Sequence, residues 1–254
     1  MKSRTAERAS ADAMAAVAAY AVAGSLLASV HSPGLGLQSV GLGAGAVVIG
    51  GAATSVLRRI PRYSTPADRV TLLRAVLVSL CAVLAVPVLF TGSPHDPLLV
   101  AMGAAAYLLD AVDGAVARRT GTASAAGARL DTATDAALVL VLSVAAAAGI
   151  GPWTLGIGAL YYVFLAAGRF RPHLKTPLPS SAARKGIGAF QPFALLLALT
   201  PGIPPAAACA APAVAFPLLM LSFARDVVEL ERRRDGQHGL SGRERRAVRP
   251  GPPR

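Results

Sequence analysis

The chain has 254 residues, 54% of them hydrophobic and 15% charged, and a formal net charge of +12. This composition excludes an ordinary soluble domain of this length and favours a membrane protein, whose helices each need about 20 apolar residues to cross the bilayer. Lys and Arg lie mostly between the apolar segments and in the tails, which favours contact with the membrane surface and with phosphate ligands over nucleic-acid binding. The two cysteines, Cys81 and Cys209, lie in separate apolar segments and predict no disulfide framework.

Apolar segments of spanning length recur along the whole chain and predict an all-α fold, a polytopic transmembrane helical bundle. In chain order the expected helices cover about 11–30, 38–57, 69–90, 97–118, 129–149, 153–170, 186–203 and 206–225. We expect the first segment to be a retained helix, because its apolar run is long for a secretory signal and Glu7 and Asp12 flank it.

The second segment contains the glycine-rich stretch 41–45, Gly-Leu-Gly-Ala-Gly. A dinucleotide-binding loop would need a preceding strand, and this stretch lies inside an apolar segment. It therefore predicts close packing of helices, because glycines let two backbones approach each other.

The gaps between the segments are of two kinds, which alternate along the chain. Those at 32–34, 92–94, 149–152 and 201–205 are short, contain turn-forming Gly or Pro, and carry almost no Lys or Arg. The others are basic, as are both tails, so the positive-inside rule predicts that these gaps and both termini face the cytoplasm. We expect the plasma (inner) membrane as the location, and a charged, disordered cytoplasmic tail at 229–254.

Four aspartates lie in or at the ends of two consecutive apolar segments: Asp110, Asp113, Asp131 and Asp135. Spacings of three and four residues place each pair on one helix face, and the short link makes the two helices antiparallel neighbours. Ionised groups in apolar surroundings are costly unless they are paired or bind metal. Oxygen-only ligands suit Mg²⁺ or Mn²⁺, and four carboxylates can hold two such ions for displacement at phosphorus.

Two other interpretations stay open at this point. The aspartates could act as helix caps and salt-bridge partners of nearby arginines, with Asp131 in an N-terminal turn, but that leaves Asp110 and Asp113 unexplained. A cation transporter also uses intramembrane carboxylates, although it would place them near the middle of the membrane, often on broken helices.

The aspartates belong to a longer pattern with fixed gaps. It reads Asp110-x2-Asp113-Gly114-x2-Ala117-Arg118-x8-Gly127-x3-Asp131-x3-Asp135. At every fixed position it resembles the signature of the CDP-alcohol phosphatidyltransferase family (class I, integral membrane). Upstream, the stretch from Pro66 to Arg74 is similar to the family's Pro-Asn-x-x-Thr-x-x-Arg opening, with Asp68 in the Asn place and the Pro shifted by one. The resemblance covers a six-helix core at 66–228 and leaves 1–65 as a basic segment, two extra helices and a linker.

The resemblance implies transfer of a phosphatidyl group from a CDP-linked lipid, usually CDP-diacylglycerol, to an alcohol, with release of CMP in phospholipid biosynthesis. Asp110, Asp113, Asp131 and Asp135 would hold two Mg²⁺ or Mn²⁺ ions, and Asp135 would also be the general base. The CDP donor would be bound by Asp68, Thr71, Gly114, Ala117, Arg118 and Gly127. A member with a soluble CDP-alcohol donor and a lipid acceptor shares the signature and stays an alternative. The family often forms homodimers, which the small-residue-rich helices allow.

The acceptor alcohol is not specified by the signature. We expect its pocket on the cytoplasmic side, with Arg129, Arg184 and Lys185 as candidate ligands. Members that use glycerol phosphate or inositol phosphate commonly carry Lys or Arg after the last aspartate, whereas this chain has Ala136. Two further polar residues lie inside apolar segments. Arg74 needs a partner in Asp68 or in the aspartate cluster, and Gln191 predicts an interhelical hydrogen bond or a place in the donor cavity.

Overall fold

The computed structural model describes residues 2–32, 34–59, 63–92, 96–120, 124–170 and 182–247, with backbone alone at 2–5, 91, 111–120, 182 and 231–247. These residues form helices and turns without any strand, which confirms the all-α prediction. The helices are α1 (Lys2–His31), α2 (Leu35–Leu57), α3 (Pro66–Thr91), α4 (Pro97–Thr120), α5 (Ala125–Gly149), α6 (Leu155–Phe170), α7 (Ala182–Leu199) and α8 (Pro205–Ala247); the 3₁₀ turn η1 (Pro152–Thr154) precedes α6.

A helix occupies each of the expected apolar segments, and within the described residues five are long and apolar enough to cross a membrane. These spans are Ala6–His31, Leu35–Leu57, Pro66–Phe90, Ala125–Gly149 and Pro205–Leu230. Large apolar side chains on their outer faces are exposed, for example Leu26 at 64%, Val47 at 77% and Leu221 at 67%. An apolar exterior of this extent fits lipid surroundings better than water. The chain therefore has the build of an integral membrane protein.

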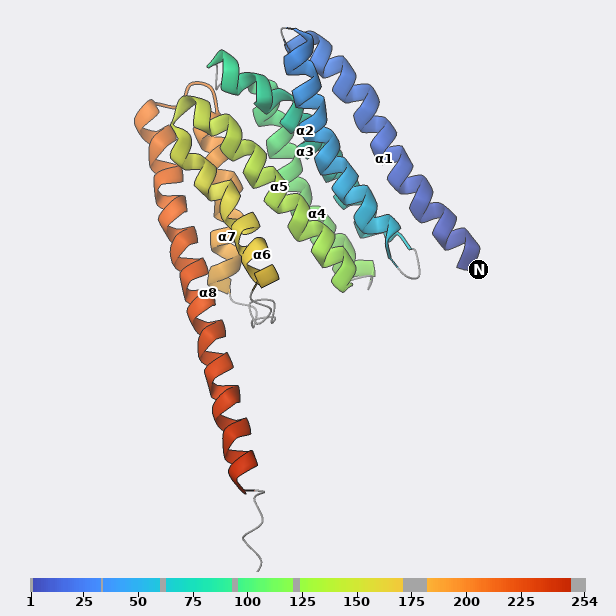
Figure 1. Ribbon diagram of the computed structural model, residues 1–254. Helices are drawn as coiled ribbons and strands as arrows, with labels where there is room; N and C mark the ends of the chain where they lie inside the picture. The colour runs from blue at the N-terminus through green and yellow to red at the C-terminus, as the bar shows by residue number, and fades with distance from the viewer. Residues whose placement is uncertain are drawn as a thin grey trace, which may run out of the picture.

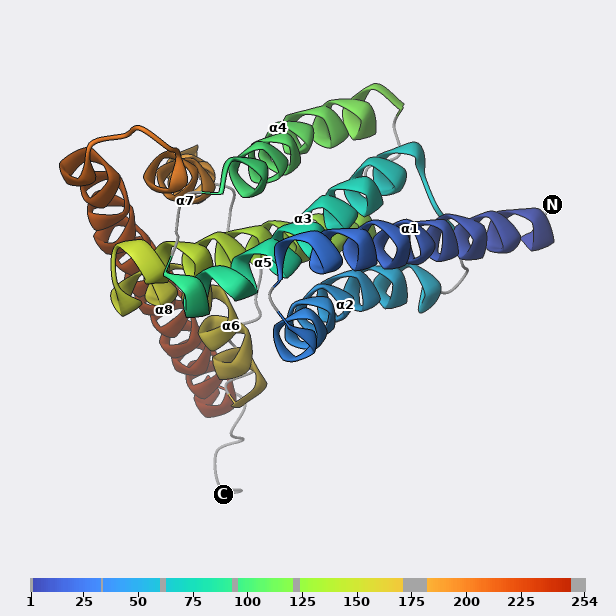
Figure 2. The same ribbon diagram turned by 90° about the horizontal axis from the view of Figure 1, so that it is seen from above.

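Helix α3 is the centre of the bundle and contacts α1, α2, α4 and α5 (Figure 2). It begins with a capping box, in which the Thr65 hydroxyl accepts from the Asp68 amide while the Asp68 carboxylate accepts from the Thr65 amide. It ends at Gly92, whose φ of 68° needs the left-handed conformation that glycine adopts readily. Of its membrane span, 78% is buried inside the protein. The polar residues of α3 that are buried therefore need partners inside the bundle; they are Asp68, Thr71, Arg74 and Ser79.

The extra N-terminal helices pack closely against α3 through the glycine-rich stretch. A Cβ atom on Gly45 would lie 2.6 Å from the Ser79 carbonyl oxygen, and one on Gly41 would lie 3.1 Å from the Val83 carbonyl oxygen. The Tyr20 hydroxyl on α1 donates to the Leu42 carbonyl oxygen of α2 at 2.5 Å. The prediction of close helix packing at 41–45 is confirmed, and α1 and α2 form one body with the core.

The predicted basic gaps adjoin helix ends that gather at one end of the bundle. Figure 1 shows the N-terminus, the end of α2, the α4–α5 junction and the end of α6 on the same side. The alternation of basic and non-basic gaps thus agrees with the up-and-down path of the chain. That this end of the bundle and both termini face the cytoplasm stays a prediction.

Helix α8 extends into the stretch where the sequence predicted a charged C-terminal tail. It continues to Ala247, far beyond the other helices, although the sequence suggested disorder from about residue 229 (Figure 1). Arg and Glu dominate much of this stretch and are good helix formers, and the next proline after Pro217 is Pro250. A helix that is already nucleated by its apolar part can continue into a charged stretch, and the disordered cytoplasmic tail at 229–254 stays a prediction.

Candidate functional site

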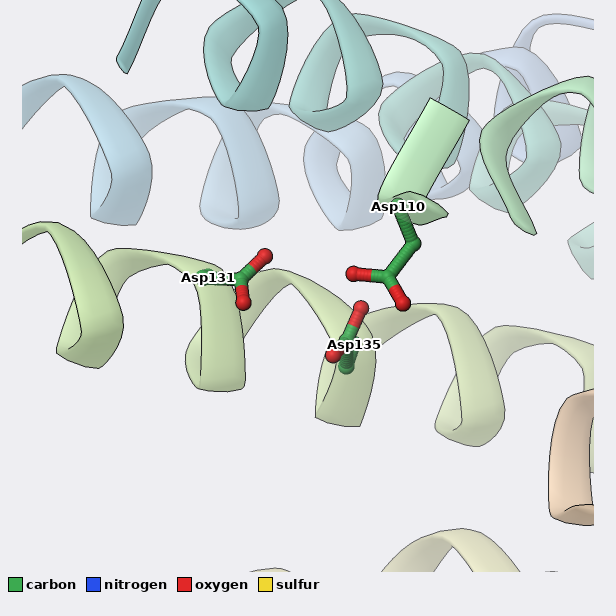
Figure 3. A group of neighbouring side chains, drawn as sticks. All are labelled: Asp110, Asp131 and Asp135. Atoms are coloured by element: carbon green, nitrogen blue, oxygen red, sulfur yellow. The ribbon is translucent and has the colours of Figure 1, made fainter. Parts of the chain in front are cut away.

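Three of the four predicted aspartates meet between α4 and α5. Asp110 lies on α4, and Asp131 and Asp135 lie one turn apart on α5 with their carboxylates turned toward Asp110 (Figure 3). One carboxylate oxygen from each lies within 4.8 Å of the others. Both helices pack mainly against α3, and the predicted meeting of the carboxylates is confirmed for these three residues. The side chain of Asp113 lies outside the described residues.

An arginine from the central helix lies among these carboxylates. Nη1 of Arg74 is 3.0 Å from Asp110 Oδ1 and 2.6 Å from Asp131 Oδ1, and Nη2 pairs with Asp135. Its Nε also donates to the Ala106 carbonyl oxygen of α4 at 3.2 Å. Of the two partners that the sequence suggested for Arg74, the aspartate cluster is therefore the one it has. The guanidinium holds α3, α4 and α5 together at the site.

The charges of this cluster do not balance among the described residues. One guanidinium faces three carboxylates, which leaves two negative charges in excess. The Arg74 side chain is 1% exposed, whereas those of Asp110, Asp131 and Asp135 are 42%, 37% and 45% exposed. The arginine thus closes the inner side of the cluster, and the carboxylates are accessible from the other side. A group of carboxylate oxygens with excess negative charge and an accessible side suits Mg²⁺ or Mn²⁺.

The interpretation of the aspartates as ordinary caps and salt bridges explains only part of this geometry. Asp131 does form an ion pair, but with a buried arginine that it shares with Asp110. The first-turn cap of α5 is supplied instead by Ser124, whose hydroxyl accepts from the Gly127 amide at 3.0 Å. The cluster is therefore a shared site and not a set of separate surface pairs.

A second buried pair lies at the start of α3, where the CDP site was predicted. Asp68 accepts from Arg59 Nη1 at 2.7 Å and Nη2 at 2.8 Å, and from the Thr65 hydroxyl at 2.8 Å. The Asp68 side chain is 2% exposed and that of Arg59 is 5% exposed. The hydrogen bond to Asp68 raises the pKa of Arg59 above its ordinary value, so Arg59 stays charged. The Asp68 oxygens are thus engaged by protein groups.

The other predicted CDP-site residues are described only in part. Thr71 is buried one turn after Asp68, and its hydroxyl donates to the Ala67 carbonyl oxygen at 3.1 Å. Gly127 lies beside Asp68, since a Cβ there would be 3.5 Å from Asp68 Oδ1. Asp68, Thr71 and Gly127 are therefore neighbours at the α3–α5 contact. Gly114, Ala117 and Arg118 lie on α4, but their side chains are outside the described residues.

A cavity of about 320 Å³ opens among α5, α6, α7 and α8 and reaches Asp135. Of the three acceptor candidates, Arg184 lines it and pairs with Asp226 of α8 at 2.9 Å. Arg129 and Lys185 are exposed and lie outside its lining. Gln191 contributes to the wall and donates to the Ala215 carbonyl oxygen at 3.1 Å, which confirms the expected interhelical hydrogen bond.

Several site residues were missed by sequence reasoning or not assigned to the site. Asp226 carried a weak signal, as an acid at the charged end of the last apolar segment. Arg59 carried none, because it is one of several arginines in a basic gap and only the fold brings it to Asp68. Arg74 carried the strongest signal, a charge inside an apolar segment, and the structure makes it the centre of the aspartate cluster.

Comparison with protein families identifies a match over most of the chain. The family described as CDP-alcohol phosphatidyltransferase matches residues 64–225, from just before α3 into α8. The match contains the aspartate cluster, Arg74 and all of the described cavity lining except Asp226, and it excludes α1 and α2. Comparison with the curated proteins and with the solved structures gives no match for this chain.

Proposed function

The chain belongs to the CDP-alcohol phosphatidyltransferase family, and on that premise we propose that it transfers a phosphatidyl group from CDP-diacylglycerol to an alcohol, releasing CMP. The acceptor oxygen forms a bond to the β-phosphorus while the bond from that phosphorus to the oxygen of CMP breaks. The observation that supports this proposal is the accessible carboxylate cluster, which among the described side chains has three carboxylates and one guanidinium. Such a cluster at the end of apolar helices suits a substrate with a charged head and lipid tails.

The cluster residues fit Mg²⁺ or Mn²⁺, which would be held by Asp110, Asp131 and Asp135, together with Asp113 from the same signature. When bound, the metal supplies positive charge for the pyrophosphate oxygens of the donor. Arg74 keeps Asp131 and Asp135 in fixed positions through its two Nη atoms. This preorganisation favours the transition state because the charged groups need not be reoriented during the reaction.

Asp135 is the proposed general base. It belongs to the carboxylate cluster and also lines the cavity, so a hydroxyl group held in the cavity can reach its carboxylate. As the hydroxyl attacks phosphorus, its proton passes to a carboxylate oxygen of Asp135. The same residue therefore connects the donor side of the site with the acceptor side. The proposed biological role is phospholipid biosynthesis at the membrane surface.

The test is release of CMP from CDP-diacylglycerol by the purified full-length protein with Mg²⁺ or Mn²⁺ and a mixture of alcohols. Asp135→Asn should lower the rate by about 10²–10⁴-fold, the usual contribution of a positioned general base. Asp12→Asn is the matched control, since Asp12 forms a surface pair with Arg69 far along the chain from the signature. Full activity in Asp135→Asn would contradict the assigned base.

Two further assays test the alternative functions, a phosphotransferase with a soluble CDP-alcohol donor and a cation transporter. A soluble CDP-alcohol with diacylglycerol replaces the donor and acceptor in a parallel assay, because the family shares one signature for both substrate arrangements. Divalent-cation uptake into liposomes without any CMP release would contradict the enzyme assignment and favour a transporter.

A further inference from the structure

The cavity among α5, α6, α7 and α8 has the size and position of an acceptor site. Its volume of about 320 Å³ lies within the range of small-molecule sites, and most of its lining is apolar. One wall holds Asp135, the proposed base. A molecule in the cavity can therefore place a hydroxyl group at the base while the rest of it contacts α6, α7 and α8.

The charges of the described lining do not favour a phosphate group. Arg184 is the one basic residue among the described lining residues, and it pairs with Asp226 at 2.9 Å. Asp135 on α5 is a second acid in the lining, and the next residue, Ala136, carries no charge. A phosphate dianion in the cavity would meet one arginine that is already neutralised and two carboxylates. Burying it there without compensation is costly.

One lining side chain has a polar atom without a partner. Gln191 is 2% exposed, and its Nε2 donates to the Ile187 and Ala215 carbonyl oxygens. Its Oε1 is buried and accepts no hydrogen bond. Buried carbonyl oxygens are usually paired, and an unpaired one is destabilising. Gln191 lines the cavity, and a rotation of its side chain would bring this oxygen to a ligand with a hydroxyl group or another donor.

We infer that this cavity binds the acceptor and selects a non-phosphorylated alcohol that carries a second hydrogen-bond donor. The reacting hydroxyl lies at Asp135, and the second donor lies at Gln191 Oε1. The Arg184–Asp226 pair in the lining carries no net charge, so phosphorylated relatives of the same alcohol are rejected. This inference rests on the proposed function and narrows its acceptor class.

The first experiment compares acceptors that differ only in a phosphate group. Glycerol is set against glycerol 3-phosphate, and inositol against inositol 1-phosphate, with CDP-diacylglycerol, Mg²⁺ and purified full-length protein. In at least one pair the non-phosphorylated alcohol should give a higher kcat/KM for CMP release, by about tenfold or more, the effect expected from an uncompensated buried charge. Preference for the phosphorylated member in both pairs overturns the inference and leaves the proposed function intact.

Two variants test the named residues. Gln191→Met should raise the acceptor KM by about three- to tenfold, the range of one hydrogen bond, with the KM for CDP-diacylglycerol unchanged. Gln38→Met, on α2 outside the cavity, is the matched control. Asp226→Asn removes the carboxylate that neutralises Arg184 and should improve the use of phosphorylated acceptors. A rise in the donor KM for Gln191→Met would place a lipid tail in the cavity and overturn the acceptor assignment.

Equilibrium binding separates this inference from the proposed function. If no acceptor supports CMP release, the proposed function fails, and radiolabelled glycerol and inositol are then bound to the protein without donor. Binding that Gln191→Met weakens, and that Gln38→Met does not, supports the cavity assignment. Absence of binding, or binding that ignores Gln191→Met, overturns it.

Discussion

Helix α3 contributes one residue to each of two arginine–aspartate arrangements, and these residues, Asp68 and Arg74, are less than two turns apart. The two arrangements differ in their charge balance. Arg59 and Asp68 form a bidentate pair, buried on both sides and completed by Thr65. Arg74 faces three carboxylates that are each more than a third exposed. The first arrangement is neutral and closed to water. The second has, among the described side chains, three carboxylates to one guanidinium, and it has one accessible side.

Both arrangements consist of arginine and aspartate, so residue type does not distinguish them. Net charge and solvent exposure do distinguish a structural pair from a candidate ligand site. A closed, neutral pair carries no excess charge that would attract a cation, and its main effect is to fix the start of α3 against the end of α2. A group of like charges that share one arginine is stabilised further by any cation that reaches it. We therefore expect metal to bind the Arg74 cluster and to leave the Arg59 pair unaffected.

The largest expected effect is on metal affinity. Asp131→Asn should weaken Mn²⁺ binding by on the order of 100-fold or more, because changes in outer-shell residues alone cost about 10–100-fold. Free Mn²⁺ is measured by electron paramagnetic resonance in detergent solution. Arg59→Met removes a charge from the neutral pair and should leave the Mn²⁺ affinity within twofold, roughly the size of indirect effects. Equal loss in both variants would contradict the comparison.

The aspartate cluster was largely predictable from the sequence, since it depends on local rules. Spacings of three and four residues give one helix face, and a short link makes α4 and α5 antiparallel neighbours. The eight helix positions follow in the same way from apolar length and turn residues. The sequence suggested two partners for Arg74, Asp68 and the aspartate cluster, and it could not decide between them. Either partner supplies the negative charge that a buried arginine needs.

The pairs made by distant segments could not be predicted in this way. Arg59 reaches Asp68 through the linker before α3, and Arg184 reaches Asp226 across two antiparallel helices. Several arginines in each basic gap satisfy the positive-inside rule equally well, so composition does not identify which one is buried. The cavity could not be predicted for the same reason, because it depends on how four helices pack against one another and not on the sequence of any single helix.

The next largest effect concerns stability. Arg59→Met and Asp68→Asn should each lower the free energy of unfolding by about 3–5 kcal/mol, since each breaks a buried pair. In Asp68→Asn a guanidinium is left buried without its counter-charge, and in Arg59→Met a carboxylate is. The double variant should recover most of the loss because no unpaired charge remains. Thermal unfolding in detergent, scored as a double-mutant cycle, measures this coupling. Additive losses would show that the two residues do not act as a pair.

The smallest effect tests whether the closed pair depends on its cap. Thr65→Ala removes one acceptor for the Asp68 amide and one donor to Asp68 Oδ2, and should cost about 1 kcal/mol, as helix caps typically do. Ser124→Ala is the matched change at the start of α5, where one hydroxyl caps Gly127 next to the open cluster. Both should lower the midpoint of thermal unfolding by similar amounts.

Only Ser124→Ala should also change Mn²⁺ affinity, because it loosens the turn before Asp131, while the Arg59–Asp68 pair isolates Thr65 from the cluster. A change in Mn²⁺ affinity for Thr65→Ala of the same size would mean that the two arginine sites form one electrostatic unit.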